Sequence, residues 1–129
     1  MASDTLFFHK EHLWVNIQGN EGYIGISGFA QERLGDIVFV ELPEVGDQIE
    51  MGKSLGSIES VKTVSKLIAP LSGEIIEVNE EILDYPEKIN EDPLGQGWLI
   101  KIAILKSDLV KELLNQADYE SYLKELANE

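Results

Sequence analysis

Cysteine is absent from the 129 residues, histidine occurs only twice, and no hydrophobic run is long. The absence of cysteine excludes a disulfide framework, a thiolate nucleophile and a thiolate metal ligand. The longest apolar runs, 98–100 and 102–105, fall far below the ~20 residues that cross a bilayer, so we expect no membrane partner. His9 and His12 do not have a helical ligand spacing, which leaves a zinc site or a catalytic base with little support. We therefore expect a chain that is not itself an enzyme.

Basic residues are also scarce, because ten lysines and arginines stand against 24 aspartates and glutamates, for a net charge of −14. This charge opposes binding to nucleic-acid phosphates. It favours solubility, and it can also steer the chain toward basic patches on partner proteins. The first twelve residues lack the basic start and long apolar stretch of a secretory signal, so we expect a cytoplasmic location.

Residues 1–129 have the length of one domain, and no linker divides them. Segments rich in apolar and β-branched residues predict strands, including 12–17, 23–26, 37–40, 73–82 and 98–104. We expect one or two helical turns over 27–35, closed by a glycine, and a loop over 86–97. These elements predict a mainly β core over about 5–105.

Two hexapeptides, GDIVFV at 35–40 and GEIIEV at 73–78, share the pattern Gly–acid–Ile–aliphatic–x–Val. They lie on either side of the hairpin described below. Such a repeat suits two related β units in a small flattened barrel or sandwich.

The apolar period changes after residue 106, where two stripes follow the candidate helix caps Ser107 and Asp118. The first stripe consists of Leu109, Val110, Leu113 and Leu114, and the second of Tyr119, Tyr122, Leu123 and Leu126. This spacing predicts two short amphipathic helices over about 107–127. We expect both stripes to pack on the β core rather than on a partner.

The stretch SLGSIESVKTVSKLIAP, residues 54–70, predicts two strands with Val61 and Lys62 in the turn between them. Tight turns favour glycine, asparagine or aspartate because these accept positive φ, and none occurs between Glu59 and Lys66. A lysine at such a tip presents a primary amine that can be acylated. A long acyl group there is a tethered arm that visits several partner sites at high effective concentration. Such a carrier needs no catalytic residues.

The motif ESVK at Glu59–Lys62 resembles the H-protein family of the glycine cleavage system, in which this lysine carries lipoate. The segments GISGFAQERLGDIVFVELPEVGD, GEIIEVNEEI and INEDPLGQGWLIKI also resemble that family, in the same order, so the likeness covers nearly the whole chain. The resemblance implies a barrel-sandwich hybrid, like a lipoyl domain, with short C-terminal α-helices. It implies covalent lipoate on Lys62, with Glu59, Ser60 and Val61 read by a lipoate-attaching enzyme.

The resemblance further implies a monomeric carrier that meets three enzymes in turn. A glycine decarboxylase loads methylamine on the arm, a tetrahydrofolate-dependent aminomethyltransferase removes it, and a dihydrolipoyl dehydrogenase reoxidises the arm. Two related modules fit less well. Biotinyl domains centre their hairpin on Met-Lys-Met, whereas Val61 and Thr63 flank the lysine here. Lipoyl domains of 2-oxoacid dehydrogenases favour Asp-Lys-Ala and are shorter.

The chain departs from the family at two places. The family reads Ser/Thr-His-Glu-Trp near its start, where this chain has Glu11, His12, Leu13 and Trp14, and it has an acid at the position of Lys66. The resemblance implies that Glu11, His12, Leu13 and Lys66 surround the cleft that holds the loaded, cationic arm, where acids would protect it. Three interpretations stay open. One is sequence drift in a glycine-cleavage carrier, and another is an H-like carrier for a heterodisulfide-reductase-like sulfur-oxidation complex or a lipoate relay. The third is a purely structural adaptor, which the absence of a lipoyl amide at Lys62 would favour.

Overall fold

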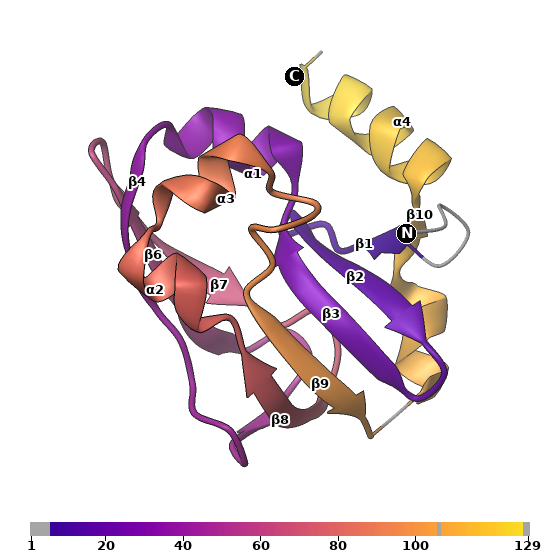
Figure 1. Cartoon of the computed structure of the whole chain (residues 1–129). Helices are drawn as coiled ribbons and strands as arrows, with labels where there is room; N and C mark the ends of the chain where they lie inside the picture. Colours follow the sequence, from indigo (N-terminus) through magenta and orange to yellow (C-terminus); the bar gives the residue numbers. More distant parts are fainter. Residues whose placement is uncertain (1–5, 106, 128–129) are drawn as a thin grey trace.

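The computed structural model describes residues 6–105 and 107–127, which form two antiparallel β-sheets with short helices around them (Figure 1). The larger sheet has the strand order β10-β1-β2-β3-β9-β8-β5, and the smaller sheet the order β4-β6-β7. The strands of the larger sheet are β1 (Leu6–Phe8), β2 (Leu13–Gln18), β3 (Glu21–Ile26), β5 (Gln48–Ile49), β8 (Gly73–Val78), β9 (Ile100–Ile104) and β10 (Leu114–Asn115). Those of the smaller sheet are β4 (Ile37–Glu41), β6 (Ser54–Ser60) and β7 (Val64–Ile68). The expected mainly β architecture, a barrel-sandwich hybrid, is confirmed.

The two sheets share one apolar core. Alternate residues of β3 and β9 point inward, which buries Ile24 and Ile102 completely, and Ile58 of β6 meets them from the smaller sheet at 1% exposed. Burying each such side chain contributes roughly 1.5–3 kcal/mol to folding. The core therefore fixes β6, the strand that leads to the lysine turn.

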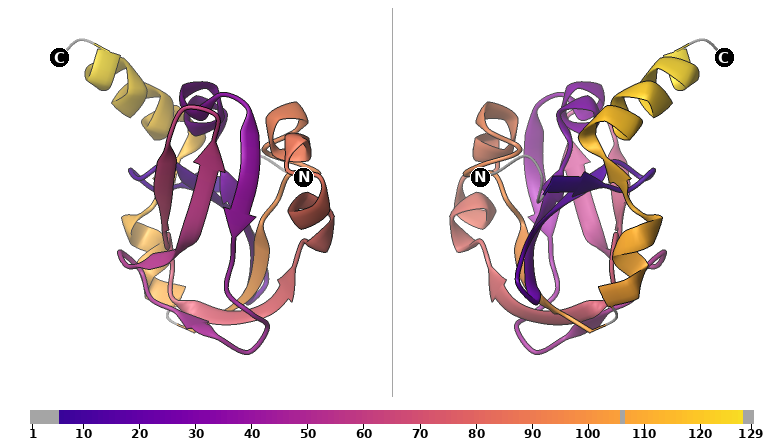
Figure 2. Two further views of the ribbon diagram at one scale, coloured as in Figure 1. Left: turned by 90° about the vertical axis from the view of Figure 1, so that its left-hand side faces the viewer. Right: turned by 90° about the vertical axis from the view of Figure 1, so that its right-hand side faces the viewer.

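Helix α1 (Gly28–Leu34) follows the sequence prediction closely. Its N-cap is Ser27, whose Oγ accepts a hydrogen bond from the backbone N of Ala30 at 3.2 Å, and it ends at Gly35. In two views the helix lies at the same end of the molecule as the β6–β7 connection (Figures 1 and 2). This arrangement places the end of α1 beside the lysine turn.

The C-terminal segment differs from the two predicted helices. A 3-10 helix covers Ser107–Glu112, Leu114 then pairs with Phe8 in the sheet, and α4 covers Gln116–Ala127. The edge of β1 takes up β10 as a partner strand, so the first apolar stripe does not continue as an α-helix. Asn115 caps α4 through its Oδ1, which accepts from Asp118 N at 2.8 Å, so the cap predicted at Asp118 was wrong. The predicted Ser107 cap and the Leu109 side chain lie outside the described side chains.

Helix α4 packs through its aromatic stripe on a small second core. The Tyr119 ring stacks on Phe8 with centroids 4.3 Å apart and planes 1° apart, above the fully buried Trp14. This packing confirms that the second predicted stripe docks on the β core. Within the described ranges, no helix has both the length and the apolar character of a membrane span.

Two short helices, α2 and α3, form where the sequence predicted the end of a strand and a loop. The predicted strand 73–82 stops at Val78, and α2 covers Glu80–Asp84. The predicted loop contains α3 (Glu87–Glu91). Both helices bury one apolar residue completely, Ile82 and Ile89 respectively, and this tertiary contact outweighs the loop-like composition.

Candidate functional site

Lys62 lies exposed at the tip of the β6–β7 hairpin (Figure 2, left). The two strands pair in antiparallel fashion up to Glu59 opposite Val64. The connection has three residues, Val61, Lys62 and Thr63, one more than the predicted central pair. In the described part of the chain, the Nζ of Lys62 takes part in no hydrogen bond or salt bridge, so its amine is free to react.

Ser60 supplies the turn chemistry that glycine usually provides. Its Oγ accepts hydrogen bonds from Lys62 N at 3.1 Å and from Thr63 N at 3.2 Å, while its own N donates to Thr63 O at 2.8 Å. Among the described non-glycine residues only His12 has positive φ, so no residue of the lysine turn adopts the backbone conformation that favours glycine. Ser60 is 5% exposed and its side chain hydrogen-bonds the backbone of the turn, whereas Glu59 and Val61 are exposed beside the lysine.

A second set of bonds attaches the hairpin to the body of the protein. The backbone N of Val61 donates to Asp36 O at 3.0 Å. On either side of Asp36, the Asn90 side chain of α3 holds the backbone: its Nδ2 donates to Gly35 O at 2.7 Å, and its Oδ1 accepts from Ile37 N at 2.9 Å. Sequence reasoning missed Asn90, because its partners are backbone atoms 53 and 55 residues away and no local pattern marks it.

Gly35 leaves room for the lysine stem. Its backbone has φ 75° and ψ −147°, a conformation almost confined to glycine. A Cβ at this position would lie 3.3 Å from the Cε of Lys62. The stem of Lys62 therefore passes over the end of α1, where a residue with a side chain would crowd it.

The predicted cleft residues fall on two different sheets. Glu11 is exposed in the turn between β1 and β2, next to His12 and Leu13, and its backbone N donates to the Nδ1 of His9 at 3.1 Å. Lys66 is exposed on β7, opposite Ser57. Leu13 is only 3% exposed and belongs to the apolar core, and its place beside the arm stays a prediction. A leucine there packs normally because β2 directs that side chain inward.

His12 and Tyr119 join α4 to the start of α1. The Tyr119 hydroxyl lies 2.8 Å from the Nδ1 of His12 and 2.8 Å from the Oγ of Ser27, the α1 cap. The His12 ring also lies against Phe29, with centroids 4.6 Å apart. Burial lowers the pKa of His12 below its ordinary value, although Glu11 opposes this, so the ring is neutral at pH 7. His12 is thus part of the packing between α4 and the start of α1.

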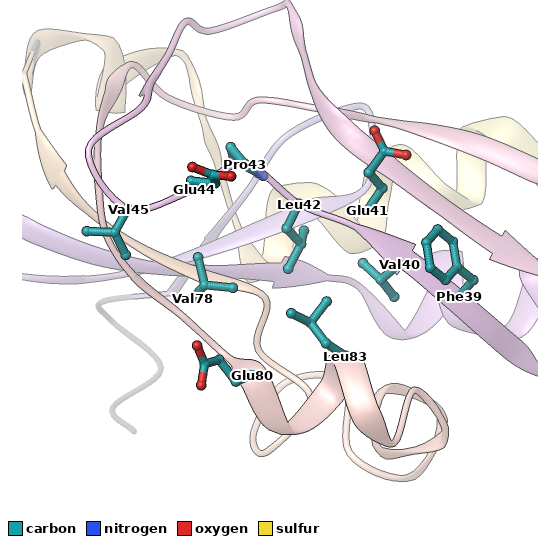
Figure 3. Close-up of a pocket in the computed structure, with 10 residues that line it drawn as sticks. All are labelled: Phe39, Val40, Glu41, Leu42, Pro43, Glu44, Val45, Val78, Glu80 and Leu83. Carbon is teal, nitrogen blue, oxygen red and sulfur yellow. The ribbon is translucent and has the colours of Figure 1, made fainter.

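An apolar groove of about 440 Å³ lies between residues 39–45 and α2 (Figure 3). Leu83 of α2 points across it toward Leu42. None of the predicted site residues lines this groove. Its Phe39 end does reach the hairpin, because Phe39 lies opposite Glu59 in the β4–β6 register. Among the described residues, no group of three or more histidines, cysteines or acids could hold a metal ion.

Comparison with known proteins identifies the family of this chain. The profile of the family described as "Glycine cleavage H-protein" matches residues 6–126. The chain belongs to the glycine cleavage H-protein family. It is 52% identical over 120 residues to the glycine cleavage system H protein of Carboxydothermus hydrogenoformans, covering 93% of this chain and 92% of that protein. It is 51% identical over 123 residues to the H protein of Herpetosiphon aurantiacus, covering 95% and 94%.

A solved H protein has the same fold. The crystal structure of a glycine cleavage system H protein from Mycobacterium marinum superposes with a TM-score of 0.82 at 40% sequence identity, covering 93% of this chain and 97% of that one. Membership of the H-protein family supports a carrier role in glycine cleavage.

Proposed function

We propose that this chain is the lipoyl carrier of a glycine cleavage system, with lipoate in amide linkage to the Nζ of Lys62. The observation that carries the proposal is the free, exposed amine at the tip of a turn that Ser60 shapes. Family membership and the ESVK motif support the same assignment. Attachment would convert the cationic amine to a neutral amide, with loss of the group that activates the lipoyl carboxylate.

The residues around Lys62 suit a long arm. The end of α1 offers Gly35, which has no side chain to meet the lysine stem. Ser60 shapes the turn itself, and Asn90 holds the neighbouring backbone of residues 35–37. When attached, the lipoyl group would supply the disulfide that takes up methylamine. The chain itself would present the arm and hold the turn still, without moving a proton.

Four enzymes are the proposed partners. Glycine decarboxylase, aminomethyltransferase and dihydrolipoyl dehydrogenase would each meet the arm, and a lipoate-attaching enzyme would read Glu59 and Val61, both exposed beside Lys62. Ser60 would contribute to that reading by setting the shape of the turn. A cytoplasmic monomer with net charge −14 would be steered toward basic surfaces around the partners' active sites.

One observation favours the alternative carrier of another pathway. Lys66 places an exposed positive charge on β7, four residues from the attachment point, where the family resemblance implies an acid. The other departure, Leu13, is explained by packing in the core. Methylamine retention on the lipoylated protein separates the two functions: retained methylamine supports glycine cleavage, and no loading supports the alternative.

The mass of the native protein tests the attachment site. We expect intact-mass and peptide analysis of protein purified from its own organism to show a lipoyl amide on Lys62. The variant Lys62→Arg keeps the positive charge and should carry no lipoyl group, while the control Lys66→Arg should be modified normally. Lipoate on another lysine, or none on native protein, would contradict the assignment.

A further inference from the structure

Asn90 connects α3 to the backbone segment 35–37, which is hydrogen-bonded to the lysine turn. Both halves of its amide are used: Nδ2 donates to Gly35 O at 2.7 Å and Oδ1 accepts from Ile37 N at 2.9 Å. An asparagine can make this pair of bonds because its side chain has one donor group and one acceptor. The residue thus holds the three-residue segment 35–37 at both ends.

The segment held by Asn90 in turn holds the hairpin. Asp36 O, between the two clamped residues, accepts from Val61 N at 3.0 Å. Ile37 lies opposite Ser60 in the β4–β6 register, and Ser60 makes the turn bonds to Lys62 and Thr63. Hydrogen bonds at both ends of the backbone segment 35–37 therefore link α3 to Val61, the residue before Lys62.

The α3 end of this hydrogen-bonded link is fixed. Ile89, next to Asn90 in α3, is completely buried in the main core, and α3 packs against both α1 and β4. The remaining neighbours of Lys62 are exposed, because Val61, Thr63 and Val64 all face solvent. Core packing thus does not hold the tip, and the hydrogen bonds through residues 35–37 are its attachment to the body of the protein.

We propose that Asn90 is a positioning residue for the acceptor lysine, which sets the height and direction of the hairpin tip over the end of α1. The inference rests on the proposed function, because it concerns how a lipoate-attaching enzyme meets Lys62. An enzyme that transfers an acyl group needs the amine in one place, and a displacement of about 1 Å lowers the rate strongly. A small reagent that acylates amines in solution needs only exposure.

Asn79 provides a matched control. It lies at the N-terminal end of α2 and, like Asn90, it bonds backbone atoms through its side-chain amide: Nδ2 donates to Gln96 O at 3.0 Å and to Trp98 O at 2.7 Å. It is 7% exposed, so its removal should cost at least as much global stability as removal of Asn90. Its bonds hold the loop before β9 and not the hairpin.

The test compares Asn90→Ala, Asn90→Asp and Asn79→Ala in the full chain. Asn90→Asp is nearly isosteric and keeps the bond to Ile37 N, but it sets a carboxylate oxygen against Gly35 O. Hydrogen exchange at the Val61 amide should become about tenfold faster in both Asn90 variants, at matched global stability, and stay unchanged in Asn79→Ala.

Acylation of Lys62 gives the second readout. With lipoate activated at its carboxyl group and a lipoate-attaching enzyme that transfers it with loss of the activating group, kcat/KM for both Asn90 variants should fall about tenfold, mainly through KM. N-hydroxysuccinimidyl acetate should modify Lys62 at the wild-type rate. Normal Val61 exchange in Asn90→Asp, or equal losses in Asn79→Ala, would overturn the inference. If the enzyme fails to acylate wild-type Lys62, the proposed function fails, and Val61 exchange still decides whether Asn90 holds the hairpin.

Discussion

Removal of the Tyr119 hydroxyl should destabilise the protein out of proportion to the single atom lost. Tyr119→Phe keeps the ring that stacks on Phe8 but deletes the bonds to His12 Nδ1 and Ser27 Oγ, each 2.8 Å long. Each hydrogen bond contributes about 1 kcal/mol net, and Ser27, at 1% exposed, cannot recover a partner from bulk water. We therefore expect a loss of about 2 kcal/mol, which for a domain of this size lowers Tm by about 6–10 °C.

Urea unfolding followed by tryptophan fluorescence measures the loss. Tyr122→Phe is the control on the same helix: its ring lies 6.2 Å from His12, and no hydrogen bond of its hydroxyl is found among the described residues. That variant should change the free energy of unfolding by less than about 0.5 kcal/mol. If the two variants unfold at the same urea concentration, the hydroxyl does not join α4 to α1 as the structure indicates.

Three further outcomes are expected. Gly35→Ala should destabilise by about 1–3 kcal/mol because of its positive φ, whereas Gly28→Ala, with open space around it, should be neutral or stabilising; equal urea midpoints would contradict this. Leu13→Glu should lower the free energy of unfolding, because it places a carboxylate at a position that is 3% exposed, whereas Lys66→Asp should leave the stability nearly unchanged and slow methylamine release; an unchanged release rate would leave Lys66 without a role in holding cargo. Burial lowers the pKa of His12 in the folded protein below 6.5, so the contribution of the neutral ring to stability is complete above pH 6.5 and is lost as the pH falls through the folded pKa. Between pH 7 and 5, the wild type should therefore lose more stability than His12→Asn. Parallel plots of unfolding free energy against pH for the two proteins would refute this.

Much of the fold was predictable because its signals are local. The apolar and β-branched residues of 23–26 predict β3, and the closing Gly35 predicts the end of α1, without tertiary information. Helix α3 was not predictable, since its five residues stand among prolines and glycines and are held by one buried isoleucine, Ile89. The strand β10 likewise forms only because β1 offers a free edge.

In the site, too, the residues marked by a local pattern were predictable and those held by distant contacts were not. Lys62 could be predicted as the acceptor from four consecutive residues, because ESVK is a local pattern. The burial of Leu13 was not predicted, since a sequence motif does not say which face of β2 meets the core. Ser60 was identified as a neighbour of the lysine, but its bonds to the turn appear only in the structure. Asn90 could not be found at all, because its partners are backbone atoms distant in the sequence.

Glycine decarboxylase exchange tests the central claim most directly. The lipoylated chain is incubated with glycine, labelled bicarbonate and a glycine decarboxylase, with the Lys62→Arg variant as the matched control. Lipoylated wild type should support exchange of label into the glycine carboxyl group and hold methylamine on the arm, and the variant should do neither. Exchange without dependence on Lys62, or no methylamine loading of a fully lipoylated chain, would contradict the account.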